Sequence, residues 1–253
     1  QKDIGESANT FSYTLNEGTK GENYEITQAE GILKVTPYTG EVIVTITEAG
    51  NEAMYDGEEY TASGYSIAIS DPLYKIADFT FSGTAEVKGT DAGSYPMELK
   101  PEDFRNINDN FTNVRFVIVD GSLEISKRTV TMTSADAEKV YDKTALTNGT
   151  VTETGDGFAE GEGAAYDVTG TQTDAGESAN AFTYTLNEDT KADNYDITTV
   201  EGTLKVTSYT TPVTVTITEH SGEAKYDGAA HDAEGYDVEI SDPLYTTDDF
   251  SFS

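Results

Sequence analysis

Apolar and polar residues alternate along several short stretches of this chain. In residues 211–218 valine and isoleucine alternate with threonine. Residues 42–46 keep Val42, Val44 and Ile46 in the same phase, and residues 129–133 keep Val130 and Met132. A period of two is typical of a β-strand with one buried face. The pattern therefore predicts strands whose apolar side packs inward and whose threonine side meets water.

Similar but shorter apolar runs occur elsewhere and are separated by turn-forming residues. Asp-Gly and Asn-Gly pairs favour tight turns, and a short helical turn is expected within residues 97–106. Further strands are expected at residues 11–15, 66–69, 114–119, 182–186 and 237–240. Many short strands without long helices predict an all-β protein of small β-sandwich (Ig-like) modules, with β-grasp-like modules as the alternative.

A block of 80 residues occurs twice in the chain. Residues 3–82 align without gaps with residues 174–253 at an offset of 171, and about 50 of the 80 positions are identical. A weaker period of half this length lies inside it, because Tyr-Asp-Lys at 141–143 falls midway between Tyr-Asp-Gly at 55–57 and 226–228. The sequence thus predicts an elongated tandem array in which two related module types alternate.

Three closing runs, Gly-x-Leu-x-Val or Gly-x-Leu-x-Ile, mark where modules are expected to end. They indicate the C-terminal part of a module at 1–37, a complete module (type B) at 38–127, a complete module (type A) at 128–208 and the N-terminal part of a type B module at 209–253. The joints between them are too short for flexible tethers and predict semi-rigid connections. Since the sequence starts and stops inside a repeat, we expect it to be a segment of a longer protein.

The order of these motifs resembles the MBG/YDG-type tandem repeats of large bacterial surface proteins. The resemblance rests on Tyr-Asp-Gly after a threonine-rich strand, then residues 170–176 (GTQTDAG), 194–198 (NYDIT) and 202–207 (GTLKVT). It covers almost the whole chain and implies a stalk or adhesin segment outside a cell-wall-bearing bacterium, without catalytic residues. The chain departs from this pattern at Lys143, where glycine is expected, and in the longer interval from Asn110 to Gly121.

Charge narrows the range of partners. The chain carries 47 acidic and 15 basic residues, for a formal net charge of −32. Such a surface repels nucleic acid phosphates and anionic lipid, so neither is an expected partner. There is no cysteine, which excludes disulfides, thiolate metal sites and a cysteine nucleophile. No apolar run of about 20 residues is present, and membrane insertion is therefore not expected.

The sequence predicts no catalytic, cofactor-binding or metal-binding residues. His220 and His231 are replaced by other residue types in the first copy, which argues against a shared catalytic histidine. Carboxylate pairs such as Glu58-Glu59 and Asp248-Asp249 arise by chance in so acidic a chain. The expectation is a protein that is not an enzyme.

Three binding or cross-linking alternatives stay open. Oxygen ligands at residues 106–110, and Asp71 and Asp242 before proline, would suit calcium, although turn formation explains the same residues. The sixteen tyrosines would suit stacking on sugar rings, although many recur at repeat-fixed positions that favour core packing. Lys34 or Lys205 would supply the amine of an isopeptide bond with an asparagine.

The sequence as a whole predicts a non-catalytic spacer. We expect structural stalk repeats of an extracellular adhesin that project a distal domain from the cell surface and are anchored to the cell wall through other regions. Neighbouring repeats of the same chain are the expected partners. The alternative is an adhesive module that binds host glycan, mucin or protein through loops that differ between the copies, such as residues 58–61 and 229–232.

Overall fold

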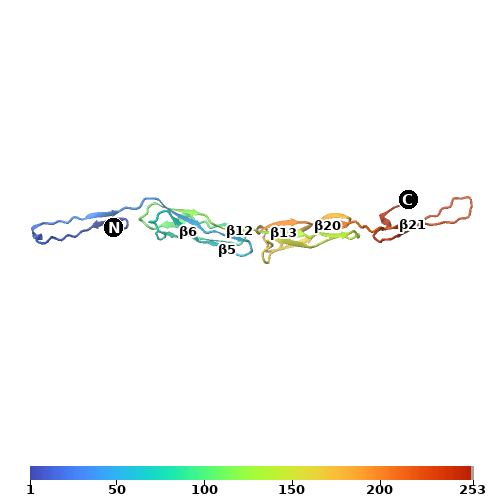
Figure 1. Cartoon of the computed structure of the whole chain (residues 1–253), viewed down its shortest axis with the longest axis horizontal. Coiled ribbons are helices and arrows are strands. Elements are labelled where there is room, and N and C mark those ends of the chain that lie inside the picture. The colour runs from blue at the N-terminus through green and yellow to red at the C-terminus, as the bar shows by residue number, and fades with distance from the viewer. Residues whose placement is uncertain (252–253) are drawn as a thin grey trace. The chain divides into compact units, whose positions relative to one another are not determined.

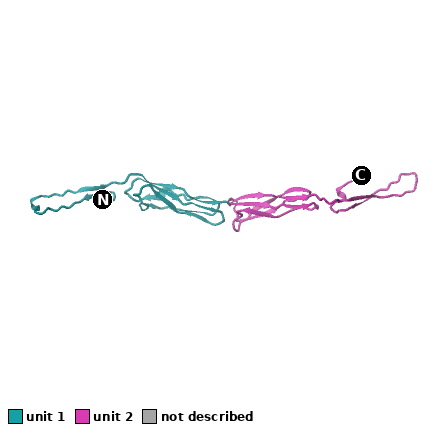
Figure 2. Ribbon diagram, in the orientation of Figure 1, with its two compact units in different colours: residues 1–127 teal, residues 128–253 magenta. Residues whose placement is uncertain are grey.

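The fold of this protein, from a computed structural model that describes residues 1–251, is all-β. The helical elements among these residues are short 3-10 helices, and none is long and apolar enough to span a membrane. The chain divides into two compact units, residues 1–127 and 128–253, coloured separately in Figure 2. This division lies at the joint between residues 127 and 128, while the finer module bounds within each unit stay predictions.

Unit 1 contains twelve strands and three 3-10 helices. In chain order the strands are β1 (Gly5–Asn9), β2 (Gly31–Val35), β3 (Val42–Glu48), β4 (Asn51–Met54), β5 (Tyr60–Ser63), β6 (Tyr65–Ile69), β7 (Phe79–Phe81), β8 (Glu86–Gly89), β9 (Gly93–Pro96), β10 (Phe104–Asn106), β11 (Val114–Val119) and β12 (Ser122–Ser126). The 3-10 helices are η1 (Gly21–Asn23), η2 (Ile76–Asp78) and η3 (Pro101–Asp103), the last within the stretch where a helical turn was predicted.

Unit 2 contains ten strands and two 3-10 helices among its described residues. The strands are β13 (Arg128–Ser134), β14 (Ala137–Val140), β15 (Val151–Gly155), β16 (Ala164–Val168), β17 (Gly176–Asn180), β18 (Phe182–Leu186), β19 (Tyr195–Val200), β20 (Gly202–Thr207), β21 (Val215–Glu219) and β22 (Tyr236–Ile240). The helices are η4 (Ala192–Asn194) and η5 (Thr247–Asp249).

Two parallel strand pairs form the centre of residues 38–127. β3 pairs in parallel with β11, and β4, which follows β3 almost directly, pairs in parallel with β12. β6 adds antiparallel to the free side of β3, and β9 adds antiparallel to β12. The first two strands of this segment, β3 and β4, therefore lie beside its last two, β11 and β12, and run in the same direction.

Residues 128–208 repeat this topology with different residues. β13 pairs in parallel with β19, and β14 pairs in parallel with β20, while β15 and β17 add on the outside as antiparallel strands. Figure 1 shows β13 and β20 within this segment. The two segments thus share one strand arrangement.

The core follows the alternation of the sequence. Along β3 the buried apolar residues are Val42, Val44 and Ile46, and the residues between them are partly exposed. An aromatic cluster extends this core, because Phe79 and Phe81 of β7 contact Phe104 of β10. Leu204 and Val206 of β20 occupy the corresponding core of unit 2.

The segments 1–37 and 209–251 form fewer strands than their copies. The strand predicted at 11–15 is wrong, whereas its copy at 182–186 forms β18, paired with β16. At the offset of 171 the equivalent of β16 would lie before Gln1 and so outside this sequence. The strand predicted at 211–218 begins later than expected, as β21, and pairs with β22.

Candidate functional site

The parallel terminal strands are the first candidate for function. In residues 38–127 the chain enters at the start of β3 and leaves at the end of β12. Because these strands run in the same direction, entry and exit lie at opposite ends of the paired strands. A force that pulls entry and exit apart would slide β3–β4 along β11–β12 and load many backbone hydrogen bonds at once.

A glycine lies where one parallel strand pair passes into the next, and there the two backbones approach closely. Gly121 lies between the β3–β11 and β4–β12 pairs, and Gly202 lies between the β13–β19 and β14–β20 pairs. A Cβ on Gly202 would lie 2.4 Å from the carbonyl oxygen of Ser134, and a Cβ on Gly121 would lie 2.7 Å from the carbonyl oxygen of Ala49. Backbone atoms leave no room at these distances. The glycine that opens each closing run is therefore required by close backbone approach.

In each unit a buried polar side chain accepts a hydrogen bond from the backbone N–H of this glycine. Buried Glu48 accepts hydrogen bonds from the backbone N–H of Leu99 at 2.6 Å and of Gly121 at 2.8 Å. In unit 2, Ser134 accepts a hydrogen bond from the backbone N–H of Gly202 at 2.9 Å. Sequence reasoning missed Glu48, and the signal that could have revealed it is an acidic residue at the apolar phase of a strand.

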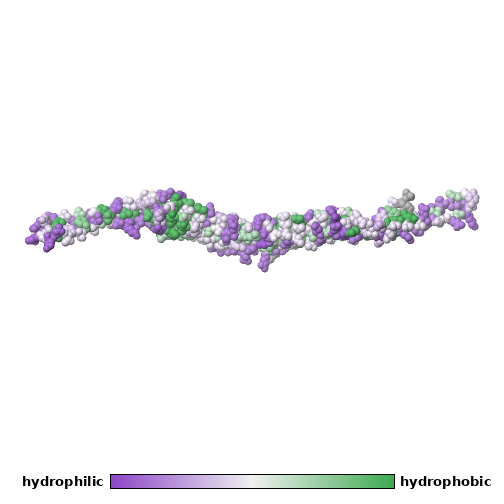
Figure 3. Space-filling model, viewed as in Figure 1, coloured by the Kyte–Doolittle hydropathy of each residue, from purple (hydrophilic) through white to green (hydrophobic). Residues whose placement is uncertain are grey.

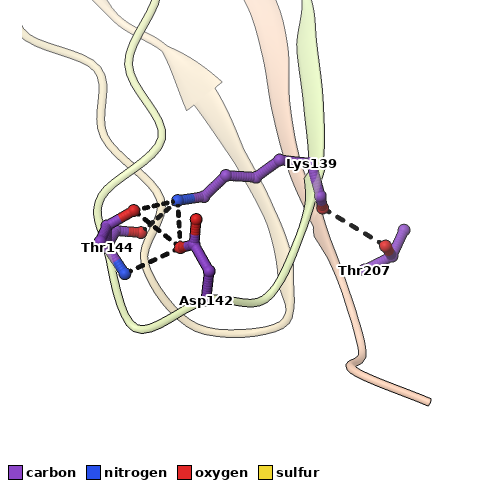
Figure 4. Close-up of polar contacts among 4 residues, drawn as sticks. All are labelled: Lys139, Asp142, Thr144 and Thr207. Carbon is purple, nitrogen blue, oxygen red and sulfur yellow. Dashed lines mark hydrogen bonds and ion pairs between the residues drawn. The ribbon is translucent and has the colours of Figure 1, made fainter. Parts of the chain in front are cut away.

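The Tyr-Asp-Lys segment forms a polar turn after β14, drawn in Figure 4. Lys139 Nζ lies 2.6 Å from Asp142 Oδ1 and donates to the carbonyl and the hydroxyl of Thr144. Thr144 also donates its backbone N–H to Asp142 Oδ1 at 2.9 Å. These hydrogen bonds, that from Lys139 above all, lower the pKa of Asp142 to about 2.

The equivalent turns use the same aspartate in the same way. Asp56 Oδ1 accepts from the backbone N–H of Glu58 at 3.0 Å, and Asp227 Oδ1 accepts from that of Ala229 at 2.9 Å. An aspartate that bonds a backbone N–H two residues on is typical of an Asx turn. The shared aspartate is therefore explained by turn formation.

Lys143 occupies a backbone conformation that favours glycine. Its φ is +63°, and the glycines at the equivalent positions, Gly57 and Gly228, have φ of +88° and +80°. A left-handed conformation costs a non-glycine residue about 1–2 kcal/mol. The turn thus keeps its shape despite the departure from glycine, and Lys143 Nζ forms an ion pair with Asp249 Oδ2 at 3.0 Å.

The candidate calcium ligands, in residues 106–110 and at Asp71 and Asp242, accept hydrogen bonds from the protein itself. Asn106 Oδ1 accepts from Tyr74 Oη at 2.9 Å, and Asn108 Oδ1 accepts from the backbone N–H of Asn110. Asp71 Oδ1 accepts from the backbone N–H of Leu73 at 2.8 Å. Asp242 makes the same contact with the backbone of Leu244 and accepts from the Tyr209 hydroxyl.

Metal ligands do not cluster in the described part of the chain. Within residues 1–251 no group of three or more histidine or acidic residues is placed to hold a metal ion. The side-chain oxygens of Asn106 and Asn108 instead accept backbone N–H groups of the turn before β11. Turn formation therefore accounts for these two asparagines.

The histidines lie next to acidic side chains on the surface. His231 Nε2 is 2.9 Å from Asp227 Oδ1, and His220 Nε2 is 3.3 Å from Asp237 Oδ2. Neither histidine contacts a hydroxyl group in these interactions. Of the acidic pairs, Glu58-Glu59 contributes an ion pair from Glu59 to Lys88 at 3.1 Å.

The lysines considered for isopeptide bonds face glutamates across strand pairs. Lys34 lies 2.8 Å from Glu6, and Lys205 lies 3.7 Å from Glu177. All four side chains are about half exposed or more. Neither lysine is brought to an asparagine by these contacts.

Tyrosines at equivalent positions differ in burial. Tyr195 and Tyr55 are buried, whereas their copies Tyr24 and Tyr226 are 62% and 97% exposed. Tyr74 is also buried, and burial followed by the charge of Asp78 raises its pKa to about 12. Within the complete strand arrangements these tyrosines serve as core residues with a hydroxyl at the edge.

Unit 1 also has a shallow groove and exposed apolar side chains. The groove, of about 740 Å³, lies on the sheet β4–β12–β9 and includes Glu52, Ser94 and Glu124 among its lining residues. Exposed Leu73 lies just before η2, and exposed Ile76 is the first residue of η2. Figure 3 shows apolar surface in unit 1 near β6, amid mostly polar surface.

Known proteins offer no further guide to this chain. No protein-family model matches it. No curated protein and no solved structure matches it either.

Proposed function

We propose that this chain is a non-catalytic stalk segment of a bacterial surface adhesin, built from MBG/YDG-type repeats. Its repeats form small β-sandwich (Ig-like) modules in an elongated array. The array projects a distal functional domain from the cell, outside a cell wall to which other regions of the protein are attached. Neighbouring repeats are its partners.

The parallel pairing of the first two strands with the last two is the observation that supports this function best. In residues 38–127, β3 and β11 pair from Val42–Val114 to Thr47–Val119, and in the same register β4 and β12 pair from Asn51–Leu123 to Met54–Ser126. At about 3.3 Å per residue the paired strands span on the order of 40 Å. Tension applied at entry and exit acts along this whole length, which suits a segment that must carry load.

Two further features fit a stalk. Residues 128–208 repeat the parallel arrangement although their sequence differs, so the property belongs to both module types. The formal net charge of −32 favours extension through repulsion between like charges. Strand topology and charge both favour the spacer role.

The direct test pulls single molecules in two geometries. Because the chain contains no cysteine, pairs of introduced cysteines define the points of attachment. Force applied through Glu41→Cys and Lys127→Cys pulls the start of β3 and the end of β12 in opposite directions along the strand axis. Glu41→Cys with Asn113→Cys holds β3 and β11 at their starting ends and peels them apart one hydrogen bond at a time.

The proposal expects the sliding geometry to resist a rupture force several-fold higher than the peeling geometry. The two variants share Glu41→Cys and differ only in the second attachment point, Lys127 or Asn113, both of which are exposed. The same strands therefore bear the load in both measurements, and a melting curve of each variant checks that their folding stabilities match. Equal forces in both geometries would argue against a load-bearing role for the parallel pair.

A further inference from the structure

The Lys143–Asp249 ion pair connects residues 128–208 with the segment that follows them. Lys143 Nζ lies 3.0 Å from Asp249 Oδ2, and both side chains are roughly two-thirds buried. The two residues are 106 positions apart, and Asp249 belongs to η5, beyond the joint at residues 208–212. This contact therefore spans one joint of the array.

Asp249 is held in place by its own turn. Its Oδ2 accepts from the backbone N–H of Thr246 at 2.8 Å and from the hydroxyl of Thr246 at 3.1 Å. Asp78, its copy in unit 1, accepts from the backbone N–H of Lys75 in the same way at 2.6 Å. The same backbone hydrogen bond therefore fixes the orientation of the carboxylate in both copies.

A second contact spans the equivalent joint near the start of the chain. Asn110 accepts a hydrogen bond from the backbone N–H of Ile4 at 2.8 Å, and its amide donates to Asp3 Oδ1 at 3.1 Å. Asp3 is the copy of Asp174 at the offset of 171. The same kind of joint is therefore bridged from the Asp-x-Gly segment of the preceding module.

Lys143 and the Asp174 segment, of which Asp3 is the copy, lie at the same end of a type A module. Leu146 and Gln172 exchange backbone hydrogen bonds at 2.8 and 3.1 Å, which brings the turn of Lys143 beside Asp174. A complete joint of this type would then contain both an ion pair from the Lys143 turn and an asparagine bridge to the Asp174 segment. Each point of contact restricts bending of the joint, and two separate points restrict it more than one.

We propose that Lys143 and Asn110 mark a two-point latch that stiffens each joint from a type A to a type B module. The partner surface is the start of the following module, represented by Asp249 and its copy Asp78. The latch gives a reason for lysine at a position whose backbone favours glycine. The inference deepens the proposed stalk function by naming what sets the stiffness of its joints.

Electrostatics support the ion pair. The hydrogen bond to Asp249 raises the pKa of Lys143, and the nearby Asp248 adds to this effect. The hydrogen bond from Lys143 lowers the pKa of Asp249. Each side chain therefore favours the charged form of the other.

The test measures the spread of distances across the joint in the full chain. Spin labels on Glu138→Cys and Glu239→Cys, both exposed residues on strands on either side of the joint, report this spread by pulsed electron paramagnetic resonance. Lys143→Ala and Lys143→Gly should each broaden the distance distribution. Lys143→Arg should keep it narrow, and Lys225→Ala, which removes an exposed lysine elsewhere in unit 2, should leave it unchanged.

Salt gives an independent arm, because at 1 M ionic strength the screening length falls to about 3 Å. The unsubstituted chain should then broaden toward the Lys143→Ala distribution. Lys143→Gly also relieves the backbone conformation, so a joint that loosens while the unit becomes more heat-stable separates the latch from folding. An unchanged distribution in both Lys143→Ala and Lys143→Gly would overturn the latch, yet leave the rupture-force test of the stalk unaffected.

Discussion

Replacing Gly202 with alanine tests whether the crossing of the long strands is as tight as the structure indicates. The added Cβ would lie 2.4 Å from the carbonyl oxygen of Ser134 and 2.7 Å from the carbonyl carbon of Ala135. Both neighbours are backbone atoms at the point where β13–β19 pairing passes into β14–β20 pairing. Relief of the clash therefore requires the strands themselves to move apart.

The expected cost is about 3 kcal/mol, at the upper end for overpacking, because no flexible side chain can give way. For a domain of 60–100 residues each kcal/mol lowers the melting temperature by roughly 4–8 °C. Gly202→Ala should therefore lower the melting temperature of residues 128–208, a segment within this size range, by about 12–24 °C. Differential scanning calorimetry measures this shift, and the transition of unit 1 serves as an internal reference.

Gly149→Ala is the matched control. A Cβ on Gly149 would meet nothing within 4 Å, and its φ is not in the left-handed region. Alanine there should be neutral or stabilise by about 0.4–1 kcal/mol through the unfolded chain. Equal melting temperatures for the Gly202→Ala and Gly149→Ala variants would refute the claim that backbone approach dictates this glycine.

Two further predictions concern carboxylates. Glu48→Gln should destabilise unit 1 by about 1–3 kcal/mol, because the new amide N–H₂ would face the N–H of Leu99 or Gly121 and leave it unpaired. Chemical denaturation measures this loss of stability. Glu52→Gln is the control: it removes an exposed like charge opposite Glu124 and should cause no loss. Asp142 has a folded pKa of about 2, below the usual value of about 4 for aspartate, so its contribution to stability is complete above about pH 4 and is lost as the pH falls toward 2. Asp142→Asn should therefore flatten the fall in the melting temperature of unit 2 across this window, and an unchanged acid limb would contradict the assignment.

Local features of the fold could be predicted well from the sequence. The alternation in residues 42–46 and 129–133 predicts β3 and β13, because side chains of a strand point to opposite faces whatever its partner. Glycine at 57 and 228 predicts left-handed turns, since no side chain opposes that conformation. These features depend on neighbours within a few residues.

Long-range features could not be predicted in this way. Glu48 finds its partners 51 and 73 positions away, at Leu99 and Gly121, and periodicity carries no information about such distances. The ion pair of Lys143 likewise depends on Asp249, 106 positions away. The candidate site is built mainly from contacts of this kind, so its residue types were visible but their roles were not.

The sequence by itself determined most of the strands and turns and the 80-residue repeat, since each is set by local periodicity or by repetition. Only the tertiary structure decided that the first two strands of residues 38–127 run parallel to the last two, because a partner strand is chosen by the packing of distant segments. Leu33 and Leu204 show the difference: they occupy equivalent positions in nearly the same local sequence, yet Leu33 is 42% exposed and Leu204 is fully buried. Leu204 lies on β20 between β14 and β17, whereas Leu33 lies on β2 beside β1 alone. Burial is a property of the neighbours a residue meets, and local sequence does not specify them.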